Sequence, residues 1–285
     1  MDFESFVKDI EKNSLNVYGV EVYEDGLLTN AYGDTDNLYD IYSATKTILS
    51  IAVGIAVDEK LFDIDRSVFD YLPEKKTLGL SSQKRNVFER ISVRRLLTMS
   101  VPGFPFRPEG DSYIDAALNA DISPDIKEFD YSNISAYLVG VALTEALGDD
   151  LGEFIEERIF TPLGIDRYEY SRCPEGYFYG ASGSKLSVNE LSRIGILLYN
   201  KGVYDGKRIL SERYVEEATS VQQMNREGGY GYFIWKYRDG FSINGKWGQK
   251  CYVLPDRKII VSFLSHIEDG SGVIRELMEK HILGL

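Results

Sequence analysis

The tetrad Ser43-Ala-Thr-Lys46 contains the two groups needed for nucleophilic catalysis by a serine. A serine hydroxyl attacks a carbonyl carbon when a neighbouring base takes its proton, and a lysine can be this base where burial lowers its pKa. Residues three apart share one face of a helix, and the apolar residues 48–57 predict a buried helix that the tetrad opens. The N-terminus of this helix favours developing negative charge, and the Ser43 N–H can donate to an oxyanion. A capping serine followed by a lysine that reaches solvent explains the tetrad alone equally well.

The same Ser-x-x-Lys spacing also begins at Ser5, Ser81 and Ser182, so the surrounding sequence must distinguish the four. Ser5 lies in a short amphipathic segment, where its lysine would be solvated. Ser81 lies in a polar segment, and Ser182 lies in a glycine-bracketed turn without a helix to position the lysine. The tetrad at Ser43 is therefore the candidate that we retain.

A second candidate is Tyr131-Ser-Asn133, the one Tyr-x-Asn sequence in a chain with 20 tyrosines. It precedes a predicted helix at residues 134–147, with Ser132 or Asn133 as the cap, so a turn can direct Tyr131 and Asn133 into one cleft. Cations near a phenol stabilise its phenolate, which makes Tyr131 a candidate general base. Asn133 offers a donor and an acceptor to an amide or ester. Taken alone, a helix cap beside a packed tyrosine is the better explanation.

Several other chemistries lack the residues they need. The chain has no Gly-x-Ser-x-Gly, no His-Glu-x-x-His, no Walker A loop and no Gly-x-Gly-x-x-Gly that opens a helix. Its two histidines, His266 and His281, fall at a strand end and in the last helix, where structural or surface roles are expected. Cys173 and Cys251 form no Cys-x-x-Cys pair, which predicts two buried, reduced thiols. We expect neither a metal nor a cofactor.

The composition excludes further classes of function. Forty-five acidic residues against 32 basic residues give a net charge of −13, and such a surface repels phosphate backbones and anionic lipid. The 285 residues, 44% of them hydrophobic, suffice for one large domain or two closely joined ones. Residues 48–57 are too few to cross a bilayer, and the amphipathic first 13 residues lack a signal core, which predicts a cytoplasmic protein without nucleic acid or membrane partners. The oligomeric state cannot be read from the sequence.

Strand patterns occur at both ends of the chain. The two N-terminal strands are joined by Asp25-Gly26, a strong hairpin signal, and the three C-terminal strands are joined by short turns. Short turns require antiparallel neighbours, so both ends are expected to build one antiparallel sheet. The predicted strands span residues 16–23, 27–32, 240–244, 250–254 and 258–265.

The middle of the chain is predicted to be helical. A central buried helix is expected at residues 45–59, and Ser187 with Glu190 forms a capping box before another helix. The further predicted helices span residues 1–13, 134–147, 191–199, 212–218 and 273–281, whereas residues 72–90 and 102–112 are predicted loops. This is an α+β fold, with an antiparallel sheet flanked by helices and an all-helical lobe. Residues 1–60 with 190–285 would form the sheet subdomain and 61–189 the helical subdomain, with the pocket in the cleft between them.

The two candidate motifs together resemble those of the penicillin-recognising serine hydrolases. The resemblance is strongest to the group of class C β-lactamases, D-Ala-D-Ala carboxypeptidases and carboxylesterases, the β-lactamase family. It extends from about Tyr42 to Val261. Further similar stretches are Ile-Ser-Val-Arg-Arg-Leu-Leu-Thr at 91–98, Phe-Asp-Tyr-Ser-Asn at 129–133, Ile-Phe-Thr-Pro-Leu-Gly at 159–164, the glycine-rich 180–187 and Gly-Tyr-Gly-Tyr at 229–232.

The resemblance implies a fold and a set of roles. The family combines an antiparallel sheet with a helical lobe, which agrees with the layout predicted above. By this likeness Ser43 is the nucleophile, Lys46 assists its deprotonation, and Tyr131 exchanges protons with the leaving group and water. Asn133 would bind the substrate.

A third family motif departs from its usual form. The family has Lys-Thr-Gly or His-x-Gly on the strand that lines the cleft. Lys246-Trp247-Gly248 falls in a predicted turn, so Ile243-Asn244-Gly245 is the preferred equivalent, and the N–H of Lys246 would complete the oxyanion hole. In either alignment Lys246 lies near the site, and Gly245 and Trp247 are expected to bind the substrate with it; a lysine with only a structural role in the turn is the alternative.

The resulting prediction is a serine hydrolase that cleaves an ester or amide of a small molecule through an acyl-enzyme on Ser43. Two alternatives remain open: a β-lactamase or D-Ala-D-Ala carboxypeptidase, and a catalytically silent binding module on the same fold. The candidate pocket walls are aromatic, and packing explains each of them equally well: Phe104, Phe106, Tyr177, Tyr179 and Trp247.

Overall fold

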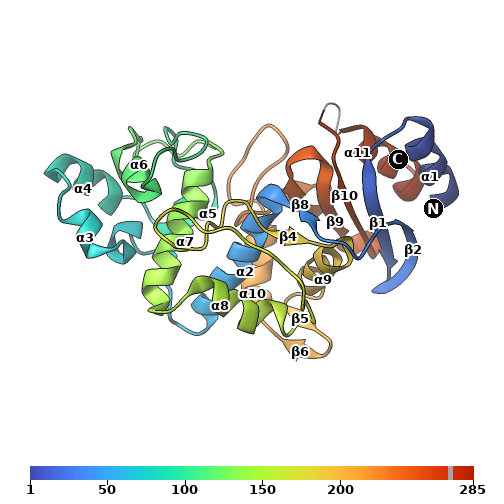
Figure 1. Cartoon of the computed structure of the whole chain (residues 1–285), viewed down its shortest axis with the longest axis horizontal. Helices are drawn as coiled ribbons and strands as arrows, with labels where there is room; N and C mark the ends of the chain where they lie inside the picture. The colour runs from blue at the N-terminus through green and yellow to red at the C-terminus, as the bar shows by residue number, and fades with distance from the viewer. Residues whose placement is uncertain (269–271) are drawn as a thin grey trace.

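A six-stranded antiparallel sheet joins the two ends of the chain. The computed structural model describes residues 1–268 and 272–285 (Figure 1). The strand order is β2-β1-β10-β9-β8-β7, so the N-terminal hairpin continues directly into the C-terminal strands. This confirms the prediction of one shared sheet. The strands are β1 (Val17–Glu24), β2 (Leu27–Gly33), β7 (Trp235–Tyr237), β8 (Gly240–Gly245), β9 (Gln249–Leu254) and β10 (Ile259–Ser265).

Helices cover both faces of this sheet, and both termini lie close together beside it (Figure 1). Alternate residues of each strand point to opposite faces. One set, which includes Val22 and Phe263, packs against α1 (Phe3–Lys12) and α11 (Gly272–Met278). The other set packs against α9 (Val188–Tyr199), and Ser187 and Glu190 form the predicted capping box at its start.

Two buried helices form the centre of the helical lobe. In α2 (Thr45–Asp58) every residue from Thr45 to Ala56 is buried, because its apolar side chains extend all round the helix. In α7 (Asn133–Leu147) the Ser132 side chain accepts from the Ile134 N–H, and Gly148 ends the helix in the left-handed conformation. Both helices were predicted within two residues of these limits.

The remaining elements are short. The helices are α3 (Glu74–Thr77), α4 (Ser82–Glu89), α5 (Val93–Leu97), α6 (Tyr113–Asn119), α8 (Leu151–Ile155) and α10 (Glu212–Thr219). Two small strand pairs complete the chain, β3 (Tyr39–Asp40) with β4 (Lys185–Leu186) and β5 (Val203–Tyr204) with β6 (Lys207–Arg208). Single turns of other helix types are η1 (Tyr42–Ala44), η2 (Val68–Tyr71), η3 (Glu156–Phe160), η4 (Lys246–Gly248), η5 (Pro255–Arg257) and η6 (Glu279–Leu283).

The prediction that residues 72–90 form a loop is wrong, because this segment contains α3 and α4. The Ser81 side chain accepts from the Lys84 N–H and caps α4, and Phe88 is fully buried. A short helix with only two apolar side chains, Val87 and Phe88, against the core has too few apolar positions to show a helical period in the sequence. Residues 102–112 contain no helix or strand, as predicted.

The core crosses the predicted subdomain boundary. One hydrophobic cluster contains residues of both segments, among them Ile48 and Leu138, so the division at residues 60 and 190 stays a prediction.

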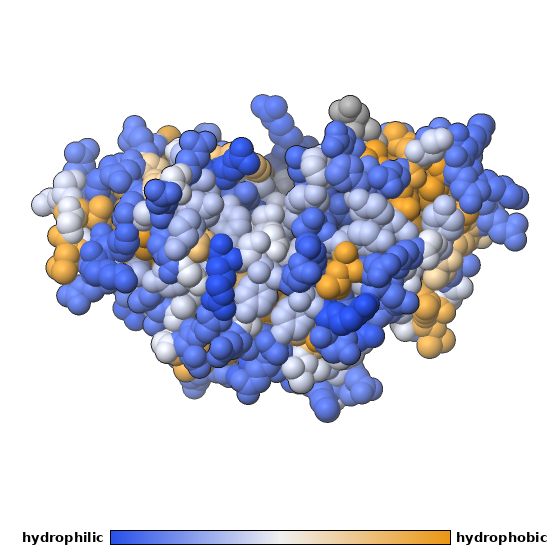
Figure 2. Space-filling view, in the orientation of Figure 1, coloured by the Kyte–Doolittle hydropathy of each residue, from blue (hydrophilic) through white to orange (hydrophobic). Residues whose placement is uncertain are grey.

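Cys173 and Cys251 are buried and unpaired, as expected. Over the described ranges, every helix is too short or too polar to cross a membrane. Figure 2 shows a largely hydrophilic face, with hydrophobic side chains gathered near the terminal helices at its right.

Candidate active site

Ser43 lies in a tight turn, η1, that leads into α2. The preceding residue Tyr42 has a φ of 47°, a left-handed conformation that non-glycine residues adopt only where the surroundings hold them. Two backbone hydrogen bonds hold this turn: Ile41 N donates to Ser184 O, and Ala44 N donates to Ile41 O. The nucleophile candidate is therefore presented by a constrained segment of backbone.

Lys46 is buried, with 1% of its surface exposed, and its ammonium nitrogen contacts three acceptors. Nζ lies 3.1 Å from Ser43 Oγ, 2.7 Å from Asn133 Oδ1 and 2.7 Å from Ala181 O. None of these groups is a carboxylate. Burial therefore lowers the pKa of Lys46 to about 7, as the sequence predicted, and makes the neutral amine accessible near neutral pH.

This set of partners suits proton transfer. A neutral amine has two N–H groups and one lone pair. The carbonyl oxygens of Asn133 and Ala181 can accept the two N–H groups, which leaves the lone pair for the Ser43 proton. The geometry thus favours Lys46 as the base toward Ser43.

Tyr131 lies beside the same pair. The Lys46 Nζ is 5.0 Å from the centre of the Tyr131 ring. Burial raises the pKa of Tyr131 to about 12, and a hydrogen bond with the Ser43 side chain opposes this shift in part. The expectation of a stabilised phenolate is therefore not met, because the effect of removal from water exceeds that of the hydrogen bond with Ser43. In this arrangement Tyr131 is a phenol and suits the role of proton donor.

An aromatic cluster encloses Tyr131. The other members are Phe106, Phe129, Tyr230 and Trp235, and the Tyr131 ring centre lies 5.7 to 6.4 Å from each of their ring centres. Phe106 was a candidate pocket wall, whereas the other three were missed. Tyr230 belongs to the Gly-Tyr-Gly-Tyr stretch, which was a usable signal, but Trp235 lies in the short strand β7, which has no such pattern.

The end of β8 touches the turn that carries the serine. A Cβ atom added to Gly245 would lie 2.2 Å from Ile41 O, so only glycine permits this approach. β8 ends at Gly245, and the following Lys246 begins η4. This arrangement agrees with the preferred alignment of the third motif, Ile243-Asn244-Gly245.

The two remaining predicted residues lie in η4. Lys246 is exposed, with Nζ 3.9 Å above the Trp247 ring, and Trp247 packs edge-on against Tyr42 at 5.1 Å. Trp247 has a φ of 61°, and its carbonyl accepts from Ser265 Oγ at 2.8 Å and from Ile267 N at 3.1 Å. All seven predicted site residues thus belong to two groups that meet at the turn of Ser43.

The other Ser-x-x-Lys lysines have ordinary structural surroundings. Lys8 is exposed, Lys84 donates to the carbonyls of Asn119 and Ala120, and Lys185 pairs with Glu169 at 2.6 Å. Burial of the lysine against its own serine is found at Ser43 and at none of the other three tetrads. The context argument thus selected the tetrad in which the two side chains meet.

The remaining candidate pocket walls have different surroundings. Phe104 is buried in the core, and Tyr177 donates to Glu145. Tyr179 lies beside Asn133: burial raises the pKa of Tyr179 to about 12, and a hydrogen bond with Asn133 has a weaker opposite effect. His281 and His266 contact carboxylates, Asp9 and Glu268 respectively. In the described part of the chain, His, Cys, Asp and Glu form no group of three suited to a metal.

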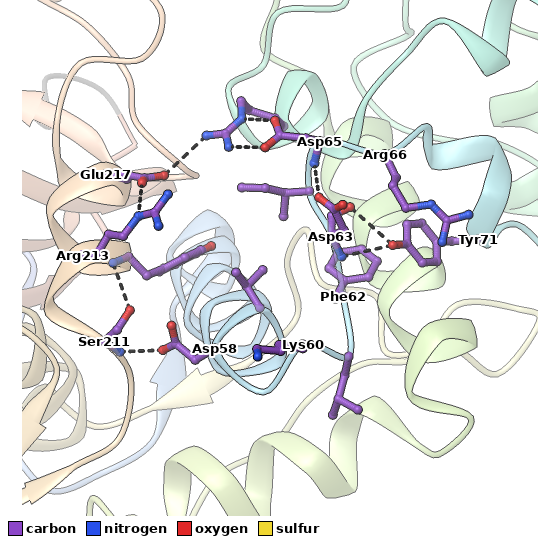
Figure 3. Close-up of a pocket in the computed structure, with 15 residues that line it drawn as sticks. Asp58, Lys60, Phe62, Asp63, Asp65, Arg66, Tyr71, Ser211, Arg213 and Glu217 are labelled. Carbon is purple, nitrogen blue, oxygen red and sulfur yellow. Dashed lines mark hydrogen bonds and ion pairs between the residues drawn. The ribbon is translucent and has the colours of Figure 1, made fainter.

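A cavity of about 680 Å³ opens at the C-terminal end of α2 and does not include Ser43 (Figure 3). Two of its arginines pair with carboxylates that also line it: Arg94 lies 2.6 Å from Asp65, and Arg213 lies 3.0 Å from Glu217. The candidate chemistry and this cavity therefore occupy opposite ends of one helix.

Comparisons with known proteins agree with the fold. The sequence profile of the family described as Beta-lactamase matches residues 11–280. The structure is similar to a Bacillus anthracis protein named "putative 6-aminohexanoate-dimer hydrolase", with a TM-score of 0.80 and 19% identity over 98% of this chain and 80% of that one. It is also similar to a "putative beta-lactamase" from Bacteroides dorei, with a TM-score of 0.78 and 19% identity over 99% and 98% of the two chains.

A third similar structure is a penicillin-binding protein homologue from Caulobacter crescentus. Its TM-score is 0.74, with 16% identity over 99% of this chain and 96% of that one. At these identities the likeness shows the fold alone. No curated protein sequence matches the chain significantly.

Proposed function

The chain belongs to the beta-lactamase family, and from this premise we propose that it is a serine hydrolase that cleaves a small ester or amide through an acyl-enzyme on Ser43. The observation that carries the proposal is the set of partners of Lys46. A buried lysine beside a serine, with two carbonyl acceptors and no carboxylate among its hydrogen-bond partners, is suited to act as a base near neutral pH.

In the proposed acylation step, neutral Lys46 takes the Ser43 proton while Oγ forms a bond to the carbonyl carbon of the substrate. The carbonyl oxygen gains the negative charge, and the N–H groups of Ser43 and Lys246 donate to it. The tetrahedral intermediate then loses its leaving group, which takes a proton from the Tyr131 phenol. The Lys46 ammonium group returns a proton to Tyr131.

Water completes the cycle in the proposed deacylation step. It adds to the acyl carbonyl as neutral Lys46 takes its proton, and the bond to Ser43 Oγ breaks as Lys46 gives a proton to the serine oxygen. Asn133 uses its Oδ1 for Lys46 and one amide N–H for Tyr179, which leaves its other N–H for the substrate. Trp247 and the aromatic cluster would contact the apolar parts of the substrate.

The test is covalent labelling by a fluorophosphonate probe, followed by intact-protein mass spectrometry. Wild type should gain the mass of one probe and Ser43→Ala should gain none. Ser5→Ala is the matched control, because Ser5 also precedes a lysine by three residues, yet it lies in α1 and its lysine, Lys8, is exposed. It should label as wild type does. Equal labelling of wild type and Ser43→Ala would reject Ser43 as the nucleophile.

The alternative of a β-lactamase or D-Ala-D-Ala carboxypeptidase receives support from the names of the similar structures. Against it stands Ile243, which occupies the position where the family has a lysine or histidine in its third motif. Hydrolysis of a chromogenic cephalosporin at a rate comparable to that of simple esters would favour this alternative. An unlabelled wild-type protein would instead favour a binding module.

A further inference from the structure

The two edge strands of the central sheet differ in length and in charge. β7 has three residues with Lys236 at its centre, and an isolated bridge joins Trp235 to Tyr230. β2, at the other edge, has seven residues, and none of them is charged or a proline. Sheet edges in soluble proteins are usually protected from further strands by shortness, charge, proline or bulges. One bulge, at Thr29, interrupts the pairing of β2 with β1, so β2 is the less protected edge.

β2 is exposed along most of its length. Figure 1 shows it at the right-hand edge of the sheet, below α1, and Figure 2 shows hydrophobic side chains in the same area. Leu27 is 71% exposed and Leu28 is 51% exposed. Within residues 1–268 and 272–285, β1 is the one strand that pairs with β2. One row of backbone N–H and C=O groups on β2 therefore has no strand partner.

The side chains of β2 divide between the two faces of the sheet. Their partners on β1 alternate between the face of α1 and the face of α9, and the bulge shifts this alternation by one residue. Leu27 and Tyr32 consequently lie on the face of α1, whereas Leu28 and Ala31 lie on the face of α9. Each face has an apolar side chain before Asn30 and another after it.

The charges around β2 limit what can pair with it. An uncharged strand offers no ion pair to a basic or acidic peptide. The carboxylates that flank β2 already have partners: Asp25 pairs with Lys258 at 3.1 Å. Asp34 accepts from the N–H groups of Asp36 and Asn37. The matching partner is another uncharged, exposed edge strand, and β2 itself is such a strand. Two chains of net charge −13 can approach along a strip that contains no charge.

A two-fold axis pairs two β2 strands in antiparallel orientation, with each contact formed twice. One register places apolar side chains together on both faces of the joined sheet. In it, Leu27 lies opposite Tyr32 of the second copy, and Leu28 lies opposite Ala31 of the second copy. Asn30 then lies on the axis and faces the Asn30 of the second copy. Apolar side chains directly opposite each other stabilise a strand pair, which favours this register.

We propose that β2 binds a second copy of this chain, and that antiparallel pairing of the two β2 strands about an axis at Asn30 joins the two sheets into one. Addition of a strand to an exposed sheet edge is a recurrent mode of protein association. This inference does not depend on the proposed hydrolase function. β1, β10 and β9 separate β2 from β8, the strand that touches the turn of Ser43, so each copy keeps its own candidate active site.

The first test measures the mass in solution by sedimentation velocity at about 100 µM chain, where an interface of low micromolar affinity is mostly occupied. It compares wild type with Leu27→Lys. The matched control is Leu78→Lys, because Leu78 is 69% exposed and lies beside α3 in the helical lobe. Circular dichroism and thermal melting show whether each variant is folded.

We expect wild type to have the mass of two chains and Leu27→Lys to have the mass of one, with a Kd raised about tenfold or more. The reason is that pairing would place an ammonium group against the Tyr32 ring of the second copy without an anion. Leu78→Lys should have the mass of wild type. A monomeric wild type would overturn the proposal. So would a dimer that persists in Leu27→Lys, or one that dissociates equally in Leu78→Lys.

A second test examines the register through the residue on the axis. Asn30→Lys and Asn30→Glu each place two like charges opposite one another, so each variant alone should be monomeric. An equimolar mixture places opposite charges together and should form a mixed dimer. Native mass spectrometry identifies this dimer when one variant is labelled with heavy nitrogen. Stable dimers of either variant alone, or a mixture that stays monomeric, would contradict pairing about Asn30.

Discussion

The two ends of α2 hold their charged side chains in opposite ways. At the N-terminal end, Lys46 is buried among carbonyl and hydroxyl oxygens, without a carboxylate partner. At the C-terminal end, two arginines that line the cavity in Figure 3 pair with carboxylates: Arg94 with Asp65 and Glu217, and Arg213 with Glu217. The Arg94 guanidinium holds the pKa of Asp65 below its usual range. The first arrangement gives an amine that titrates near neutral pH, and the second favours the charged form of Asp65 beside Arg94.

The candidate chemistry thus lies away from the cavity of Figure 3. That cavity contains arginine–carboxylate pairs. The surroundings of Lys46 instead hold a desolvated amine in contact with the Ser43 hydroxyl and with two carbonyl oxygens. The predictions below test this contrast.

The largest expected effect is that of removing the amine. Lys46→Ala should lower kcat for the best ester substrate by about 10³-fold, within the range of general acid–base catalysis, because Ser43 then has no base. The measurement is steady-state kinetics, with circular dichroism as the check on folding. Turnover within about tenfold of wild type would contradict the role of Lys46 as base.

The second effect is a dependence on pH. Lys46 accepts a proton only when neutral, so kcat/KM should rise with pH up to about 7, near the pKa of the free enzyme, and then level off. Tyr131 must be protonated to act as a donor, and with a pKa of about 12 it stays protonated over this range. A profile that is flat from pH 5 to 9, or that falls as the pH rises through 7, would contradict this assignment.

A smaller effect is expected from Tyr131→Phe. This change removes the phenol and keeps the ring within the aromatic cluster. Amide hydrolysis should fall by about 100-fold, whereas esters with good leaving groups, which depart without a proton, should lose far less. Equal losses for amides and activated esters would show that Tyr131 is not the proton donor.

The smallest effect is expected at the other end of α2. Arg213→Ala breaks an exposed pair with Glu217, which should cost at most about 1 kcal/mol of unfolding free energy and leave kcat/KM unchanged. Urea unfolding and the same kinetic assay measure both quantities. If activity fell tenfold, the two ends of α2 would have to be coupled, and the contrast between them would lose its meaning.

Much of the fold could be predicted because local patterns are strong where they matter. The hairpin at Asp25-Gly26, the all-round apolar α2 and the cap of α7 at Ser132 all depend on residues within one or two turns of one another. Segments such as β7 and α4 could not be predicted, because they are short and packing against distant residues stabilises them.

The site was predictable in its residues more than in its electrostatics. Ser43, Lys46, Tyr131 and Asn133 meet as expected. The prediction of a phenolate at Tyr131 is wrong, because aromatic rings enclose the phenol, and burial raises its pKa more than the hydrogen bond with Ser43 lowers it. The sum of these opposing effects depends on the depth of burial, which sequence spacing does not contain.

The sequence by itself determined that Ser43 and Lys46 share one face at the start of a buried helix, since that relation depends only on helical geometry over three residues. Only the tertiary structure decided what surrounds the amine. Its partners at Asn133 and Ala181 are 87 and 135 residues away along the chain. The pKa of a lysine depends on desolvation and on the groups that replace water, and here folding brings these groups together from distant segments.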